Sequence, residues 1–221
     1  MSSPLKIFEA DKLLQEALEK HRIDLGLLIA ETGLWANPAV HHHLKKENGT
    51  GAWRPNVRRA RPGEVRRSLT EGILLDDNTF ANTYIKAAIG LTRDQVIGYE
   101  TCHVWPRTCY HPAYHTTIAN LVLLPRALAG VTDHNKQVLA VLQYRSYELY
   151  GFHPAEVSEP TRPAQYPASW LSPMPFNERV QRSLLARSWA GHHQAFQPTG
   201  LSFGEPGRLN SNVKPHERRS F

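Results

Sequence analysis

Residues 99–151 read YETCHVWPRTCYHPAYHTTIANLVLLPRALAGVTDHNKQVLAVLQYRSYELYG and concentrate the groups that can move a proton or hold a metal. His103 follows a strand-like run that a proline ends. Asn120 opens a second apolar run, which predicts a strand antiparallel to the first. His134 stands at the head of an amphipathic helix that stops at Gly151, with a cap predicted just before it, at position 132 or 133. Two strands and a helix with a polar group at each junction predict a small cage for one divalent cation.

The composition is that of a soluble globular protein. The chain has 221 residues, of which 41% are hydrophobic and 21% charged, so a sizeable core is possible. No apolar run approaches the roughly 18 residues needed to span a bilayer, and the N-terminus lacks the order of a secretion signal. The two cysteines, Cys102 and Cys109, indicate a reducing compartment and no disulfide framework. We therefore expect a cytoplasmic protein with no membrane partner.

The formal net charge of +6 is concentrated in residues 41–70, which contain eight basic residues and only two acidic ones. The basic residues are Lys45, Lys46, Arg54, Arg58, Arg59, Arg61, Arg66 and Arg67. A localised basic segment suits a polyanion, and double-stranded DNA is the expected partner. The alternative is a solvated loop whose charge has no partner. Within this segment, residues 49–63 read as an exposed arm that becomes ordered on its anionic partner.

The remainder of the chain is predicted to be mainly helical. The predicted helices cover residues 5–21, 24–32 and 37–43, the stretch from Asp76 or Asp77 to Gly90, and residues 177–189. Residues 41–43 are three adjacent histidines, which point in three directions on a helix and are predicted to be surface groups rather than ligands. Six prolines between residues 153 and 175 predict an irregular strap. The predicted organisation is a basic helical region over 1–95, a core over 96–152, the strap and final helix over 153–190, and a flexible tail over 191–221.

The segments CHVWP, ANLVLLP and TDH resemble the HNH, or His-Me finger, nucleases, whose core is a ββα-metal motif. The resemblance covers about Tyr99 to Tyr150 and rests on a His-x-x-Pro turn and an Asn-Leu-x-x-Leu run. It implies an α+β fold, a mainly helical chain around a ββα-metal core. It also implies a metal-dependent endonuclease that hydrolyses DNA, of restriction or phage-defence type. A protein with one active site would need to form a homodimer to cleave both strands of DNA.

The resemblance assigns a role to each of three residues. His103 is the general base that takes a proton from the attacking water. Asn120 either pins the loop by hydrogen bonds to the backbone or lends its carbonyl oxygen to the metal. His134 binds the divalent cation, magnesium or manganese first and zinc second, which stabilises the charge on the scissile phosphate.

Two departures from the family pattern leave alternatives open. Cys102 stands where the family commonly has an Asp or His ligand, and a thiolate suits zinc better than magnesium. Three alternatives follow. Cys102 is buried and structural, which we favour, or it is a ligand to a softer metal, or another oxygen or nitrogen group takes the place of this ligand. The gap between Asn120 and His134 is longer than in compact members, so His134 is either a ligand or a capping or core residue.

Further side chains near this stretch are candidates for contacting phosphates. Arg107, Arg126 and Arg145 border the predicted site and are candidates for bidentate contacts with phosphate, and a place on the solvated helix face is the alternative for Arg145. His115 either contacts a phosphate, completes the metal shell or is a surface histidine, the last being favoured. His103 on its own would also fit a core histidine.

Two rival functions compete with the endonuclease. In the first, the chain is a nucleic-acid-binding module that uses the HNH core as a scaffold and is inactive because a ligand is missing at Cys102. In the second, the protein is structural and is stabilised by zinc.

Overall fold

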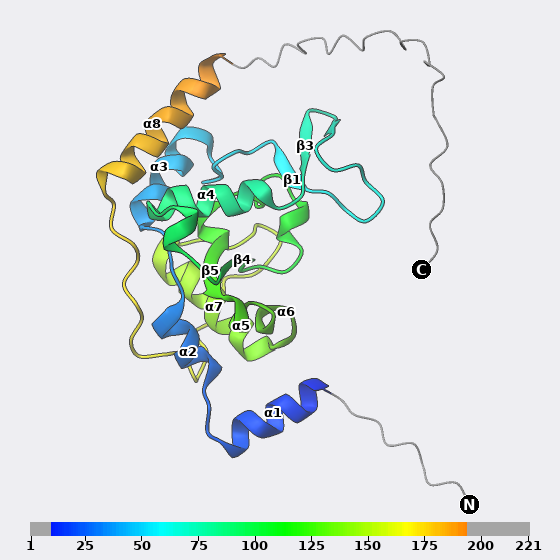
Figure 1. Cartoon of the computed structure of the whole chain (residues 1–221), viewed down its shortest axis with the longest axis vertical. Coiled ribbons are helices and arrows are strands. Elements are labelled where there is room, and N and C mark those ends of the chain that lie inside the picture. The colour runs from blue at the N-terminus through cyan, green and yellow to red at the C-terminus, as the bar shows by residue number, and fades with distance from the viewer. Residues whose placement is uncertain (1–9, 194–221) are drawn as a thin grey trace, which may run out of the picture.

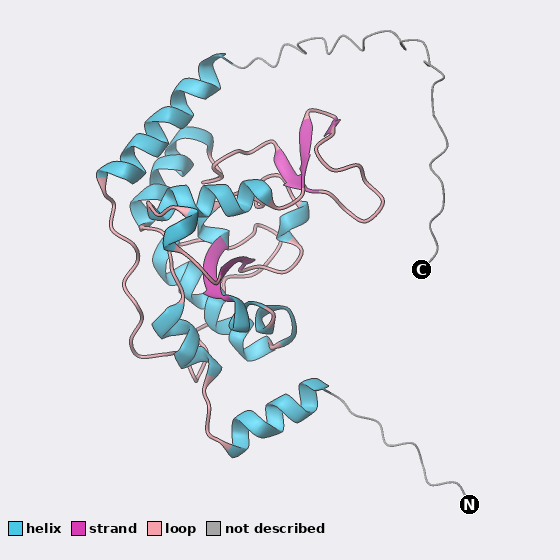
Figure 2. Ribbon diagram, in the orientation of Figure 1, coloured by secondary structure: helices cyan, strands magenta, loops and turns pink. Residues whose placement is uncertain are grey.

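An antiparallel hairpin of two strands lies at the centre of the chain (Figure 1 and Figure 2). The computed structural model describes residues 10–193. The elements in these residues are α1 (Ala10–Lys20), α2 (Leu25–Thr32), α3 (Pro38–Asn48), β1 (Val57–Arg59), β2 (Leu69–Thr70), β3 (Ile73–Asp76), α4 (Thr79–Ile89), β4 (Tyr99–His103), β5 (Leu121–Pro125), α5 (Arg126–Ala129), α6 (Val131–His134), α7 (Lys136–Tyr150) and α8 (Glu178–His193). The hairpin pairs β4 with β5, and His103 lies opposite Leu121. The predicted mixture of helices and strands is confirmed, as is the antiparallel pairing.

The two faces of the hairpin carry different helices. Successive side chains of a strand point to opposite faces. On one face, Thr101 Oγ1 lies 2.5 Å from Asn82 Oδ1 of α4. On the other face, Cys102 Sγ lies 4.0 Å from the carbonyl oxygen of Ala129, the last residue of α5. His103 shares the face of Thr101, so it belongs to the α4 side of the hairpin.

The hydrophobic core follows the same division. Leu121 and Leu123 of β5 pack in a cluster with Ala81 and Ile85 of α4. The alternate residues of β5 pack in a second cluster, which contains Cys102, Ala129 of α5 and Val138 and Leu142 of α7, with Val131 of α6 against it. Helices α5, α6 and α7 therefore cover the face of the hairpin opposite to that of His103.

Two predicted helices of the N-terminal half are capped by the residues at which they were predicted to begin, but one of them is longer than predicted. The Asp24 side chain accepts hydrogen bonds from the first turn of α2, and Asn37 does the same for α3. Helix α3 runs on to Asn48 instead of stopping at residue 43, and it ends at Gly49 in the left-handed conformation. Residues 5–9 of the first predicted helix lie outside the described residues.

His41 is buried, so the prediction that all three adjacent histidines lie on the surface is wrong for this residue. Its side chain is 1% exposed, and its ring packs against the rings of Tyr150 and Phe152. Gly51, at a φ of +72°, lies directly on the imidazole, and a Cβ there would come within 2.1 Å of the ring. Only glycine fits this close approach. His42 and His43 are exposed, as predicted.

Burial of His41 predicts a loss of stability in acid. Desolvation, assisted by the charges of His42 and Lys45, lowers the pKa of His41 to about 4. An unfolded chain protonates histidine near pH ~6.5, so below that pH the unfolded state binds more protons and stability falls as the pH drops. We expect His41 to cost about 2 kcal/mol of unfolding free energy between pH ~7 and pH ~5.

Urea unfolding of the parent chain and of a His41→Leu variant at the two pH values measures this loss. The variant should lose less stability on acidification than the parent, by the amount assigned to His41. A His43→Leu variant removes an exposed histidine from the same helix and should behave as the parent does. Equal acid sensitivity in the parent and in His41→Leu would show that His41 is not the group responsible.

The segment predicted as an exposed arm is part of the fold, which corrects that prediction. Ala52, Trp53 and Val57 are buried, and the Trp53 ring stacks on that of Tyr84 in α4. Strand β1 then pairs in parallel with β3, and β2 pairs with β3 in antiparallel fashion. A few buried apolar side chains thus dock this Gly- and Arg-rich segment on the body.

The proline-rich segment packs on the body as an irregular strap, as predicted. Residues 151–177, all of them described, contain no helix or strand. The Leu171 N–H donates to the carbonyl oxygen of Ala30, and the Met174 N–H donates to that of Trp35. Helix α8 then packs against α4 through Val180 and its neighbours. The predicted tail lies beyond His193 for most of its length, outside the described residues.

None of the described helices is both long enough and apolar enough to cross a lipid bilayer.

Candidate functional site

His103 is the last residue of β4, as predicted, and its ring is held in one orientation. His103 Nε2 lies 3.0 Å from the carbonyl oxygen of His115. Because a carbonyl oxygen only accepts, Nε2 carries the proton and Nδ1 keeps the lone pair. The two imidazole rings stack with their centroids 5.2 Å apart and their planes inclined by 11°. His103 is therefore a neutral imidazole whose basic nitrogen is Nδ1.

Electrostatics keep His103 unprotonated. Desolvation by burial is the main cause that lowers its pKa to about 3, and the positive charge of Arg59 and the neighbouring His115 act in the same direction. The negative charge of Asp76 opposes them and raises the pKa. At neutral pH the ring is unprotonated and has a free lone pair, but the lowered pKa also makes it a weaker base than an exposed histidine.

His115 is buried, which corrects the prediction of a surface histidine. Its side chain is 0% exposed, and its Nε2 lies 2.9 Å from Oδ2 of Asp76, which is 2% exposed. The Asp76 carboxylate also accepts the backbone N–H groups of Thr79 and Phe80, at 3.1 and 3.0 Å, in the first turn of α4. Both Asp76 and Asp77, between which the sequence left the start of this helix open, accept N–H groups of its first turn, although Asn78 occupies the N-cap position. The Asp76 carboxylate also holds His115 beside His103.

Asn120 is fully buried, and its amide is occupied by the loop between the strands. Oδ1 accepts the backbone N–H of Trp105 at 3.1 Å. Nδ2 donates to Thr108 Oγ1 at 2.9 Å and to the carbonyl oxygen of Tyr114 at 3.0 Å. Of the two roles considered for Asn120, metal binding and fixing the loop, its hydrogen bonds correspond to the second. An amide with these three bonds and no exposed surface does not fit a cation ligand.

Cys102 and His134 do not join His103. Cys102 is buried in the core on the opposite face of the hairpin, in keeping with the structural role favoured from the sequence. His134 is exposed at the end of α6, which belongs to that same opposite face. The cap of α7 is Asn135, whose side chain accepts two backbone N–H groups, and not Thr132 or its neighbour.

The residues assigned to the cation by the family resemblance therefore do not fit a metal site. His103 and Cys102 point to opposite faces, the Asn120 amide is occupied, and His134 lies on another element in solvent. Within residues 10–193, no group of three or more His, Cys, Asp or Glu side chains is arranged to hold a metal ion. We derive no chemical step through a cation.

Several of the basic residues predicted to contact nucleic acid are engaged within the chain. Arg58 donates two hydrogen bonds, of 2.6 and 2.7 Å, to Glu64, and these bonds hold the pKa of that carboxyl down, to about 2. The other engaged arginines are Arg54, over the Phe80 ring, Arg67, with Asp77, Arg126, with Glu100, and Arg145, with Glu148 and over the Trp170 ring. These contacts engage Arg58 and Arg145 most, whose side chains are 11% exposed, whereas Arg67 and Arg126 remain largely exposed.

The other predicted basic residues are exposed. They are Lys45 and Lys46 in the last turn of α3, Arg59 at the end of β1, Arg61 and Arg66 in the following loop, and Arg107 just after β4. Arg59 lies opposite Asp76 in the register of β1 and β3. The exposed Arg59 is thus the strand neighbour of the residue whose carboxylate holds His115, which brings a positive charge close to the two imidazoles.

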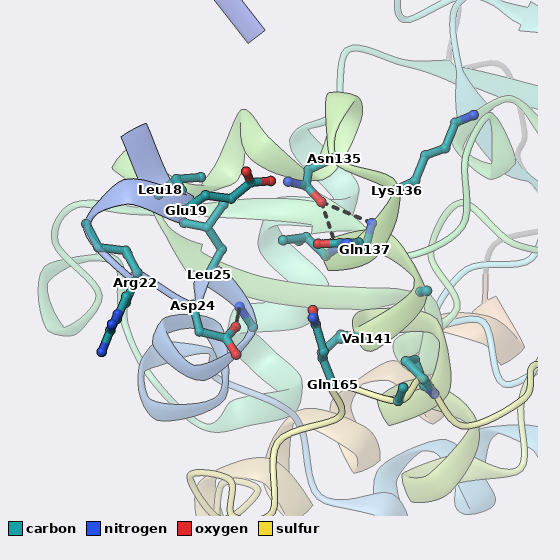
Figure 3. A pocket seen from close by; sticks show the side chains of 16 residues that line it. Leu18, Glu19, Arg22, Asp24, Leu25, Asn135, Lys136, Gln137, Val141 and Gln165 are labelled. Carbon is teal, nitrogen blue, oxygen red and sulfur yellow. Dashed lines mark hydrogen bonds between the residues drawn. The ribbon is translucent and has the colours of Figure 1, made fainter. Parts of the chain in front are cut away.

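A cavity of about 730 Å³ lies away from this region, between α1, α2 and the start of α7 (Figure 3). Asp24 and Asn135, the caps of α2 and α7, stand at its wall, and Val141 and Gln165 form part of its floor. Its lining contains none of the residues that the sequence singles out as a site. Acidic and basic side chains both border it, so its charge selects no class of ligand.

Comparison of the chain with protein-family models, with curated proteins and with solved structures gives no match.

Proposed function

We propose that this protein hydrolyses phosphodiester bonds of nucleic acid, with His103 as the general base. The observation that carries the proposal is the bond from His103 Nε2 to the His115 carbonyl, which leaves Nδ1 as a fixed basic nitrogen. The surrounding order of strand, pinned loop, strand and helix supports it, because the family resemblance implies this order around its base. DNA is the expected substrate.

The proposed chemistry needs one proton transfer to His103. Nδ1 takes a proton from water, and the water oxygen attacks phosphorus as the bond from phosphorus to the leaving oxygen breaks. The leaving oxygen takes a proton from solvent, and His103 returns its proton to solvent. The negative charge of Asp76 stabilises the imidazolium that forms in the first step, because that charge favours the protonated ring.

The basic surface supports a polyanionic substrate. Arg59 is exposed and close enough to His103 for its charge to lower the pKa of the imidazole. Arg61 and Arg66 extend the charge along the loop that joins β1 to β2, at the side of the molecule where β1 and β3 lie (Figure 1). A phosphodiester chain that follows these arginines passes His103.

A second candidate function is a nucleic-acid-binding module whose core is a scaffold without catalysis. The observation that favours it is that Cys102 and His134 belong to the opposite face of the hairpin from His103 and that the Asn120 amide is occupied by the loop, because the family resemblance makes the base depend on a cation. The basic surface would act in the same way in both functions.

Nicking of a supercoiled plasmid by the purified full chain tests the proposal. The reaction is run with chelator and with magnesium, manganese, cobalt or zinc, and binding to the same DNA is followed in parallel by gel shift at low and moderate salt. The proposal expects nicked circles and binding that weakens with salt. Binding without nicking under every condition would support the scaffold instead, and absence of both would exclude a nucleic-acid substrate.

A further inference from the structure

A continuous set of contacts runs from the start of α4 to His103. Asp76 Oδ2 contacts His115 Nε2 at 2.9 Å. The His115 ring stacks on the His103 ring, and the His115 carbonyl oxygen accepts from His103 Nε2 at 3.0 Å. His115 thus touches His103 twice, once through its ring and once through its backbone. The orientation of the proposed base depends on where His115 sits.

The position of His115 in turn depends on Asp76. His115 Nδ1 is buried and makes no hydrogen bond with any residue in the described part of the chain. The contact at Nε2 is consequently the hydrogen bond that sets the rotation of the ring. Without this bond both nitrogens of the buried imidazole would be unsatisfied, which is unfavourable for polar groups shielded from water.

We propose that Asp76 is a positioning residue for His103 that acts through His115. This inference rests on the proposed role of His103, and it assigns to Asp76 a function beyond capping a helix. Both oxygens of the Asp76 carboxylate accept backbone N–H groups of α4. Oδ2 also contacts His115 Nε2, and both side chains are buried away from water. A cap needs no such burial, because Asp77 next to it accepts from the same Thr79 N–H while its side chain stays partly exposed.

The nearly isosteric Asp76→Asn variant tests the proposal. An asparagine keeps an oxygen for the first turn of α4, but it removes the charge and the carboxylate acceptor that faces His115. We expect cleavage to slow by about 100-fold, the loss typical of a reacting group displaced by about 1 Å. We also expect the ¹⁵N spectrum of His103 to change from a single Nε2–H tautomer to a mixture of tautomers.

The ¹⁵N spectrum separates this proposal from the proposed function, because it needs no catalysis. If the parent chain does not cleave nucleic acid, the His103 tautomer still reports whether Asp76 positions the ring. An Asp77→Asn variant removes the neighbouring cap and should leave both the rate and the His103 tautomer unchanged. A folded Asp76→Asn variant with the parent's tautomer and rate would overturn the proposal.

A second variant covers the case in which Asp76→Asn does not fold. His115→Gln keeps the backbone carbonyl and places an amide N–H near the former Nε2, so the hydrogen bond to Asp76 can persist. It removes the ring that stacks on His103. The proposal expects the Nε2–H tautomer of His103 to be retained, because the His115 carbonyl oxygen that accepts this proton stays in place while the side chain at position 115 is still bonded to Asp76. Loss of that tautomer in a folded His115→Gln variant would overturn the proposal.

Discussion

The His103→Ala variant is expected to cleave phosphodiester bonds about 100- to 10,000-fold more slowly than the parent chain, the usual range for loss of a general base. His103 is the residue on the α4 face of the hairpin whose basic nitrogen is fixed by a backbone bond. Alanine removes Nδ1 without touching the exposed arginines. Affinity for DNA and its salt dependence should therefore stay close to those of the parent. Initial rates of plasmid nicking and gel-shift titrations measure the two quantities.

The His134→Ala variant is the matched control. The family resemblance makes His134 a cation ligand, whereas the structure leaves it exposed on α6, on the opposite face of the hairpin from His103. We expect the rate of this variant to equal that of the parent. Loss of cleavage in His134→Ala would support His134 as a cation ligand. Full activity in His103→Ala would show that His103 is not the general base.

Local chemistry allowed much of the fold to be predicted. Asp24 and Asn37 are polar residues directly before apolar helical runs, and each caps its helix. His103 was predicted at the end of a strand because a proline follows closely, and it is the last residue of β4. Asn120 was predicted to open the second strand, and it ends the short turn just before β5. These features depend on neighbours along the chain, which a sequence displays directly.

The three-stranded sheet was missed because its strands are too short to show a period. β1 has three residues and β2 two, and the parallel pairing of Val57 with Leu74 joins parts of the chain that are far apart in sequence. Glycine, proline and arginine dominate the segment, which favoured an arm. The burial of Trp53 and Val57 outweighs this composition.

In the candidate site, the position of His103 could be predicted, but its neighbours Asp76 and His115 could not, because their contact joins distant parts of the sequence. Asp76 and His115 are 39 positions apart, and Asp76 already had a local explanation as a helix cap. No local pattern indicates that one carboxylate both caps α4 and holds an imidazole. His134 was predicted at the head of the long helix, but it is the last residue of α6, because the chain breaks at Asn135 before α7 begins.

The Asn120→Ala variant is expected to lose about 3–5 kcal/mol of unfolding free energy, which corresponds to a fall in Tm of about 10 °C for a chain of this size. Alanine leaves the Trp105 N–H, the Thr108 hydroxyl and the Tyr114 carbonyl without the bonds that the amide makes. Because the Asn120 amide is buried and water does not replace it, each group carries its desolvation cost. Thermal and urea unfolding measure the loss.

The exposed Asn56 provides the control, since Asn56→Ala should change stability by less than about 0.5 kcal/mol. A second consequence separates the loop from the general stability of the fold. Asn120 ties both ends of the loop that carries His115, so well below the Tm the Asn120→Ala variant should still release His103 from its single tautomer. A loss of stability of less than about 1 kcal/mol, or an unchanged His103 spectrum, would mean that the loop holds its shape without the Asn120 amide.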